Sequence, residues 1–171
     1  MLKVNYKHYI NNGHAKFDKN DCLWQNLLET GEGWRASDCN TKLPFMCKTP
    51  ADPFAPPTTA SPVTSTPGPR ECPEDWTEFS GACYLHQLPL VSWYGAAYQC
   101  QAMGGNLTSV LSKEEEQFIN ELATSYLDDS PWGPQGTFHL GGYITGPRPL
   151  YIDIEWVDES EVTMFPSSPS T

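Results

Sequence analysis

Six cysteines constrain this 171-residue chain more than any other feature. They are an even set with no two separated by only two residues, whereas structural zinc sites usually need such close pairs. We therefore expect disulfides rather than metal ligands, and disulfides persist only in oxidising compartments. The six are Cys22, Cys39, Cys47, Cys72, Cys83 and Cys100.

The beginning of the chain shows no leader. Residues 1–20 contain no apolar core of a signal peptide, and no run of about 18 apolar residues suits a membrane-spanning helix. Because the cysteines indicate secretion, we expect an extracellular protein whose leader is missing from this chain by truncation.

Charge is distributed unevenly along the chain, whose net charge is −11. Residues 1–48 hold seven basic and five acidic side chains, whereas residues 72–171 hold two basic and fourteen acidic ones. An acidic surface repels nucleic acids and anionic membranes, so we expect neither as a partner. Solubility alone is enough to explain this acidity.

A proline-rich segment divides the chain. Residues 49–71 contain seven prolines, five threonines and two serines, and they offer little apolar surface to bury. This composition predicts an extended, O-glycosylated linker, with an ordered proline-rich loop as the alternative. The linker separates residues 1–48, which are too few for a stable domain of their own, from residues 72–165 and a tail at 166–171.

The part after the linker begins with a predicted hairpin. Trp76, Phe79 and Tyr84 alternate around the turn at residues 80–81, and cysteines flank the two strands, which predicts a disulfide-stapled hairpin. Later strands are expected at residues 107–110, 138–142 and 152–157.

Two helices are predicted from their capping residues. Ser92 begins the first helix, which ends at the glycines 104–105. Ser112 begins the second, where Glu115 three residues later predicts a capping box. The run of glutamates at 114–116 is expected to be a solvated helix face. The apolar stripe of the second helix is Phe118, Ile119, Leu122 and Tyr126.

Taken together, these stretches resemble the C-type lectin-like domain family. The N-terminal half of that family has a cysteine hairpin, two helices, a Trp-Ile-Gly-Leu strand and a Trp-x-Asp-Gly-Ser motif. The corresponding residues here are 72–84, 92–100, 104–110, 113–122, 139–142 and 156–160. Its C-terminal half reads Cys-Val, Trp-Asn-Asp-x-x-Cys and Pro-Phe-x-Cys. The corresponding residues here are 22–23, 34–39 and 44–47.

The order of the two halves is reversed, because the C-terminal half (residues 1–48) precedes the N-terminal half (residues 72–165). Two tandem domains, each cut in the middle, account for this order, and so does one permuted domain. We expect the permuted domain: an α+β C-type lectin-like fold with two helices, small antiparallel sheets and a long loop. The resemblance implies the disulfides Cys72–Cys83, Cys47–Cys100 and Cys22–Cys39.

The resemblance also implies where a calcium-dependent sugar site would lie. Sugar-binding members hold Ca²⁺ with a Glu-Pro-Asn or Gln-Pro-Asp motif in the long loop and an Asn-Asp pair after a tryptophan. Residues 11–17 contain neither loop motif, and Arg35 and Ala36 stand at the Asn-Asp positions. A cation and a methyl group supply no oxygen ligand for Ca²⁺, so we expect a degenerate calcium site, no metal and no cofactor.

Aromatic, amide and basic side chains of the first part are the remaining ligand candidates. They are Asn11, Asn12, His14, Trp24 and Arg35. Asn106 begins an Asn-x-Thr sequon and is a candidate N-glycosylation site.

No catalytic motif of serine hydrolases, zinc proteases or P-loop proteins occurs, so we do not expect an enzyme. By resemblance, the expected function is extracellular recognition of a glycan ligand. The alternatives are a calcium-independent module that binds a protein ligand and a non-functional fragment of a longer tandem-lectin protein.

Overall fold

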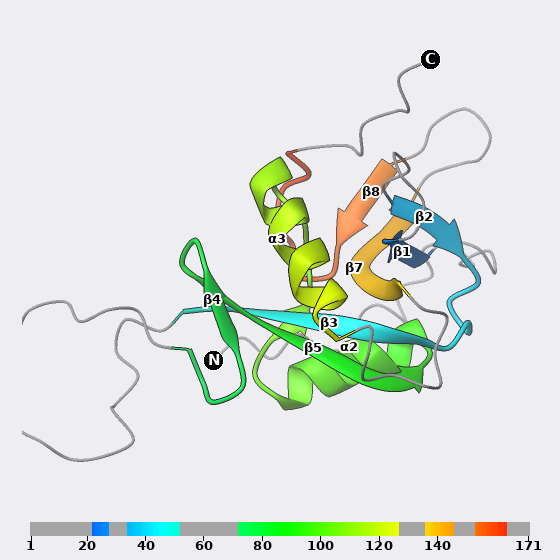
Figure 1. The fold of residues 1–171 in the computed structure, drawn as a ribbon. Helices are drawn as coiled ribbons and strands as arrows, with labels where there is room; N and C mark the ends of the chain where they lie inside the picture. Colours follow the sequence, from blue (N-terminus) through cyan, green and yellow to red (C-terminus); the bar gives the residue numbers. More distant parts are fainter. Residues whose placement is uncertain (1–21, 28–33, 52–71, 127–135, 146–152, 164–171) are drawn as a thin grey trace, which may run out of the picture.

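The computed structural model describes the chain in five ranges, which are residues 22–27, 34–51, 72–126, 136–145 and 153–163 (Figure 1). These ranges form eight strands and two helices. The strands are β1 (Cys22–Asn26), β2 (Trp34–Ser37), β3 (Leu43–Pro50), β4 (Thr77–Phe79), β5 (Ala82–Val91), β6 (Asn106–Leu107), β7 (Thr137–Thr145) and β8 (Asp153–Trp156). The helices are α2 (Trp93–Ala102) and α3 (Lys113–Thr124).

The strands join in one mixed sheet rather than in separate small ones. Its main order is β2-β1-β7-β3-β5-β4, with β6 beside β3 and β8 beside β7. All described pairings are antiparallel except that of β3 with β7, where Phe45 lies opposite His139. Strand β3 comes from before the proline-rich segment, and both of its main neighbours come from after it. The two parts of the chain therefore share one sheet.

The end of β3 corrects one boundary of the predicted linker. Thr49 and Pro50, which the composition assigns to the linker, pair with Cys83 and Ala82 of β5. The backbone N–H of Ala51 continues this pairing by donating to the carbonyl of Gly81 over 3.0 Å. A proline fits here because it is the last residue of its strand. Residues 52–71 lie outside the described ranges.

The two helices begin at the predicted caps. The Ser92 hydroxyl accepts a hydrogen bond from the Gly95 N–H, and the Ser112 hydroxyl accepts one from the Glu115 N–H. The second half of the predicted capping box is displaced by one residue, because the Glu115 carboxylate accepts from the N–H of Leu111. Both caps satisfy N–H groups that a helix start leaves without intrahelical partners.

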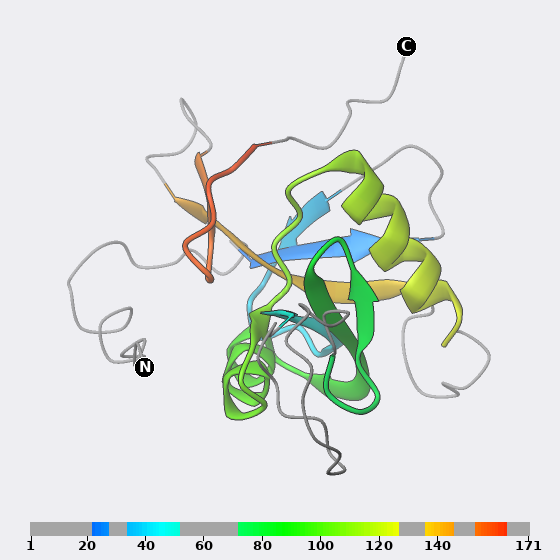
Figure 2. The same ribbon diagram turned by 90° about the vertical axis from the view of Figure 1, so that its left-hand side faces the viewer.

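The helices lie on opposite sides of the strands β3 and β5 (Figures 1 and 2). Helix α2 contributes Trp93, Ala96, Ala97 and Cys100 to one buried cluster. Helix α3 contributes Ile119 and Ala123 to a second cluster, with Phe118 and Leu122 packed against it. Each helix therefore buries one stripe against the sheet.

Two glycines let β7 approach its neighbours closely. A Cβ atom on Gly141 would lie 2.4 Å from the carbonyl oxygen of Leu107, and one on Gly142 would lie 2.5 Å from the Leu23 side chain.

The strand predicted at 107–110 is shorter than expected, since β6 contains only Asn106 and Leu107. The backbone of Thr108 still donates to Met46, over 2.9 Å.

Three disulfides connect the elements, and no cysteine is free. The bonds are Cys22–Cys39, Cys47–Cys100 and Cys72–Cys83, the pairs that the resemblance implies. The second bond joins β3 to α2, so it ties the part before the proline-rich segment to the part after it.

Candidate ligand-binding surface

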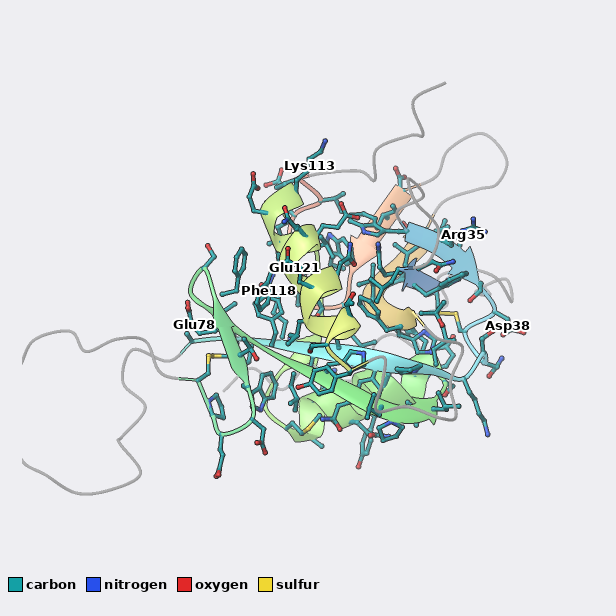
Figure 3. The ribbon with its side chains drawn as sticks, viewed as in Figure 1. Arg35, Asp38, Glu78, Lys113, Phe118 and Glu121 are labelled. Atoms are coloured by element: carbon teal, nitrogen blue, oxygen red, sulfur yellow. A yellow bond between two sulfur atoms is a disulfide. The ribbon has the colours of Figure 1, made fainter. Side chains whose placement is uncertain are left out.

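Trp24 and Arg35 face each other across the β1–β2 pair at one edge of the sheet. The guanidinium carbon of Arg35 lies 6.0 Å from the centre of the Trp24 ring, at the outer limit of a cation–π contact. Both side chains are half-buried. Figure 3 shows Arg35 at the outer side of β2. The pair combines an aromatic face with a fixed positive charge.

The turn after β2 holds the next polar groups. The Asp38 carboxylate accepts hydrogen bonds from the backbone N–H and the side-chain amide of Asn40, over 2.9 and 3.0 Å. The N–H of Thr41 donates to the carbonyl of Asp38 and closes the turn. The disulfide from Cys39 to Cys22 anchors this turn to β1. The Asp38 carboxylate is therefore engaged within its own turn.

Among the ligand candidates from the sequence, the structure brings Trp24 and Arg35 together. Asn11, Asn12 and His14 lie outside the described residues. Asn106 is half-buried on β6, where it pairs with Lys48 of β3. Glycosylation of Asn106 therefore stays a prediction.

Sequence reasoning missed a carboxylate that the sheet holds in place. Both oxygens of Glu155 on β8 accept hydrogen bonds from β7, one from the Tyr143 hydroxyl over 2.7 Å and one from Thr145 over 3.2 Å. The register explains this, because Tyr143 lies opposite Glu155 and also opposite Cys22 of β1. The sequence predicts a strand at residues 152–157, but the cross-strand partners depend on a register that the sequence does not specify.

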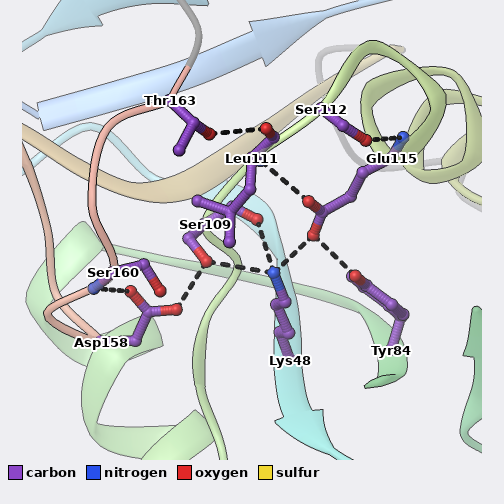
Figure 4. Close-up of polar contacts among 9 residues, drawn as sticks. All are labelled: Lys48, Tyr84, Ser109, Leu111, Ser112, Glu115, Asp158, Ser160 and Thr163. Atoms are coloured by element: carbon purple, nitrogen blue, oxygen red, sulfur yellow. Dashed lines mark hydrogen bonds and ion pairs between the residues drawn. The ribbon is translucent and has the colours of Figure 1, made fainter. Parts of the chain in front are cut away.

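The structure corrects the expectation that residues 114–116 form a solvated face. Glu115 is buried, and its carboxylate accepts a hydrogen bond from the Tyr84 hydroxyl over 2.6 Å (Figure 4). It also forms an ion pair with Lys48 of β3 over 2.5 Å. Glu115 is the third residue of α3, and its side chain lies on the side of the helix that faces the sheet. Glu114, beside it in the sequence, is exposed.

The same network extends to the turn after β8. Lys48 contacts the hydroxyl of Ser109 over 3.2 Å, and that hydroxyl donates to the Asp158 carboxylate. Burial and the neighbouring Glu115 carboxylate raise the pKa of Tyr84 far above its usual value, so its hydroxyl stays a donor. This network packs inside the fold, so its role is structural.

The described residues hold no group of three or more His, Cys, Asp or Glu side chains placed to bind a metal ion. Neither described helix is long and apolar enough to cross a membrane.

Comparisons with curated proteins found related sequences, although no family model and no solved structure matches the chain. Human C-type mannose receptor 2 is 33% identical over 135 residues, which is 79% of this chain and 8% of the receptor. Human lymphocyte antigen 75 is 29% identical over 152 residues, covering 84% of this chain and 8% of that protein. Lactose-binding lectin l-2 of Anguilla japonica is 39% identical over 70 residues, or 41% of this chain and 42% of the lectin.

The lengths of these matches indicate which parts of the chain each match includes. The chain spans about 8% of the length of the first two relatives. A match that covers 79% of the chain is longer than residues 72–171, so it crosses the proline-rich segment. The 70-residue match is short enough to fall on one part. These relatives, together with the three disulfides and the two helices, show that the chain belongs to the C-type lectin-like domain family.

Proposed function

We propose that the chain recognises glycans through the Trp24–Arg35 surface and that it does so without a bound calcium ion. The observation that carries this proposal is the contact of the Arg35 guanidinium with the Trp24 ring at the sheet edge. In the family pattern, this edge carries the Asn-Asp pair that binds Ca²⁺. Arg35 and Ala36 do not fit that ion, because neither side chain offers an oxygen ligand.

Two properties of the pair suit a sugar. The apolar face of an indole packs against the C–H groups of a pyranose, and a guanidinium donates several hydrogen bonds to oxygen atoms. The relatives support the ligand class through their names, which include a lactose-binding lectin and a mannose receptor. Recognition of this kind involves no chemical reaction. The disulfides favour an oxidising compartment outside the cytosol.

A glycan array probed with and without EDTA tests the proposal. We expect binding that EDTA leaves unchanged and that Trp24→Ala weakens by roughly tenfold or more, the size of a binding hot spot. Tyr98→Ala is the matched control, because Tyr98 is an exposed aromatic on α2 and belongs to neither β1 nor β2. Binding that EDTA abolishes would contradict the calcium-independent site.

Recognition of a protein ligand is the second candidate. One observation favours it, since Arg35 and Ala36 supply no oxygen ligand at the positions where sugar-binding members of the family hold Ca²⁺. The array separates the two candidates. A cooperatively unfolding chain that binds no glycan would favour the protein-binding alternative, and a chain that shows no cooperative unfolding would support a non-functional fragment.

We also propose that residues 1–48 and 72–165 form one permuted domain when this chain folds alone. The central position of β3 and the Cys47–Cys100 bond support this organisation. The competing account is two neighbouring domains, each present in part, and it is supported by the receptor match that crosses the linker. Refolding a mixture of isotopically light and heavy chains distinguishes them, because one domain links Cys47 and Cys100 only within chains of the same label.

A further inference from the structure

We infer that the outer face of helix α2 is a contact surface for a second copy of this chain. The inference does not depend on glycan recognition. It begins from the distribution of charge, because residues 79–112 contain no Asp, Glu, Lys or Arg, although such residues make up 18% of the chain. The one histidine of this stretch, His86, is buried. All of α2 lies within the stretch, so each of its side chains is uncharged.

The outer face of α2 exposes apolar side chains. The helix lies on the opposite side of β3 and β5 from α3 (Figures 1 and 2), and it buries one stripe against the sheet. Tyr98 is 66% exposed, and Met103, which caps the end of the helix, is 39% exposed. In the described ranges no other large apolar side chain is as exposed as these two. A protein contact on this face would remove their apolar surface from water.

Small residues beside Tyr98 allow another helix to approach closely. Gly95 stands three residues before Tyr98 and Ala102 four residues after it, so the three lie on one face of the helix. Gly95 is half-buried and Ala102 is exposed. Tyr98 of one copy therefore has room to pack over the small residues of the other, as ridges of one helix pack into grooves of another. Tyrosine is also enriched at protein interfaces, since its rigid ring loses little conformational entropy there.

Charge selects a second copy as the occupant of this face. A two-fold interface places the same patch of both copies against itself, so a charge near the axis meets a like charge. The chain has a net charge of −11, and α3 carries Lys113 and four glutamates. Of the two described helices, α2 is therefore the one that can lie against its own copy without repulsion between like charges.

The two ends of α2 favour an antiparallel arrangement of the copies. The hairpin that carries Glu74 and Asp75 lies beyond the end of the helix, where Trp76 would lie 3.3 Å from a Cβ atom on Gly105. The helix dipole makes the beginning of α2 positive, and its first turn holds no acidic side chain. In an antiparallel pair, the acidic hairpin of one copy lies nearer the beginning of α2 in the other copy than its end.

The size of the face predicts a weak dimer. The ten residues of α2 form a helix about 15 Å long, whose outer face falls well short of the roughly 800 Å² that each partner contributes to a stable interface. We expect a dissociation constant on the order of 0.1 mM. A glycan array uses protein far below that concentration, where the chain is a monomer, so Tyr98→Ala still serves as the control for Trp24→Ala there.

Sedimentation equilibrium of the full chain, from about 10 µM to about 1 mM, tests the inference. We expect the average mass to rise from that of one chain towards that of two across this range. Raising the salt concentration from about 0.02 M to about 0.5 M should strengthen the association, because salt screens the repulsion between two acidic copies and leaves a neutral contact unaffected. Association that weakens at high salt would show an ionic interface and would overturn the assignment to α2.

Two variants that add the same charge locate the contact. Tyr98→Glu places a carboxylate in the centre of the outer face and should weaken the dimer by about tenfold or more. Thr124→Glu adds an equal charge at an exposed position of α3 and should change the dissociation constant by less than about threefold. Thermal unfolding of each variant confirms that the fold is intact.

The remaining outcomes separate this inference from its alternatives and from the proposed function. Equal losses in Tyr98→Glu and Thr124→Glu would show that net charge, rather than the face of α2, controls association. A chain that stays a monomer at about 1 mM and at both salt concentrations would overturn the choice of a second copy as the occupant. Neither result changes the expected outcome of the glycan array, which measures binding by the monomer.

Discussion

The Nζ atom of Lys48 lies 2.5 Å from the Oε1 atom of Glu115, and the proline-rich segment separates these two residues in the sequence. The side chains are only 15% and 8% exposed, so the ion pair is largely removed from water. Tyr84 and the N–H of Leu111 occupy further positions on the same carboxylate. The pair therefore connects β3 to α3 through a well-satisfied network, while the preceding residue, Cys47, connects β3 to α2.

Removing one partner of this network should destabilise the fold strongly. We expect Glu115→Ala to lower the free energy of unfolding by about 3 kcal/mol, because Lys48 then keeps a buried charge without its carboxylate. Urea denaturation measures the change. Glu114→Ala, on the exposed side of the same helix, is the control and should change stability by less than about 0.5 kcal/mol. Equal effects of the two substitutions would contradict the structural role of Glu115.

Acidification should destabilise the protein through its buried histidines. Burial lowers the pKa of His86 to about 4 from its usual 6.5, and it also lowers the pKa of His139. Between these pH values the unfolded chain binds a proton that folded His86 does not, so stability falls as the pH falls from 6.5 towards 4. The His86 contribution amounts to at most about 3 kcal/mol.

Unfolding at pH 7, 5.5 and 4.5 measures this dependence. His86→Phe preserves the ring contacts with Tyr126 and Phe138 and removes the titrating group. Its stability should therefore decline less steeply with falling pH than that of the parent chain, with His139 and the carboxylates accounting for the remainder. Identical slopes would show that His86 titrates normally in the folded state.

The two disulfides that include cysteines from residues 1–48 should differ in how much they stabilise the fold. Cys47–Cys100 joins residues separated by 53 positions and Cys22–Cys39 joins residues separated by 17. Loop-closure entropy depends on the length of the loop that a disulfide closes. Removing Cys47–Cys100 by paired Cys→Ala substitution should therefore lower the free energy of unfolding by about 1 kcal/mol more than removing Cys22–Cys39. Chemical denaturation of the two double variants checks the order of stabilities.

Close backbone approach makes Gly141 intolerant of any side chain. Gly141→Ala would place a methyl group 2.4 Å from the Leu107 carbonyl oxygen, which is backbone and cannot rotate away. We expect a loss of about 2 kcal/mol or more. Gly104→Ala is the comparison, because Gly104 has open space and only a positive φ of 84°, so its cost should be nearer 1 kcal/mol. A thermal melt of both variants tests this ranking.

Local features were predictable because they depend on neighbouring residues. Ser92 and Ser112 cap the helices as their sequence contexts predict, since a capping hydroxyl and its N–H partner are three residues apart. The hairpin turns at Ser80 and Gly81 as predicted, and both residues have positive φ values. Helix α3 buries Ile119, as the apolar stripe predicts.

By itself, the sequence determined the family, the caps and the hairpin, because each of these depends on short patterns of neighbouring residues. Only the tertiary structure decided that β3 enters the centre of the sheet, that Glu115 turns inward to meet Lys48, and that Arg35 lies against Trp24. These contacts join residues far apart in the chain, and they follow from strand register and from the satisfaction of buried charge, which no local pattern specifies.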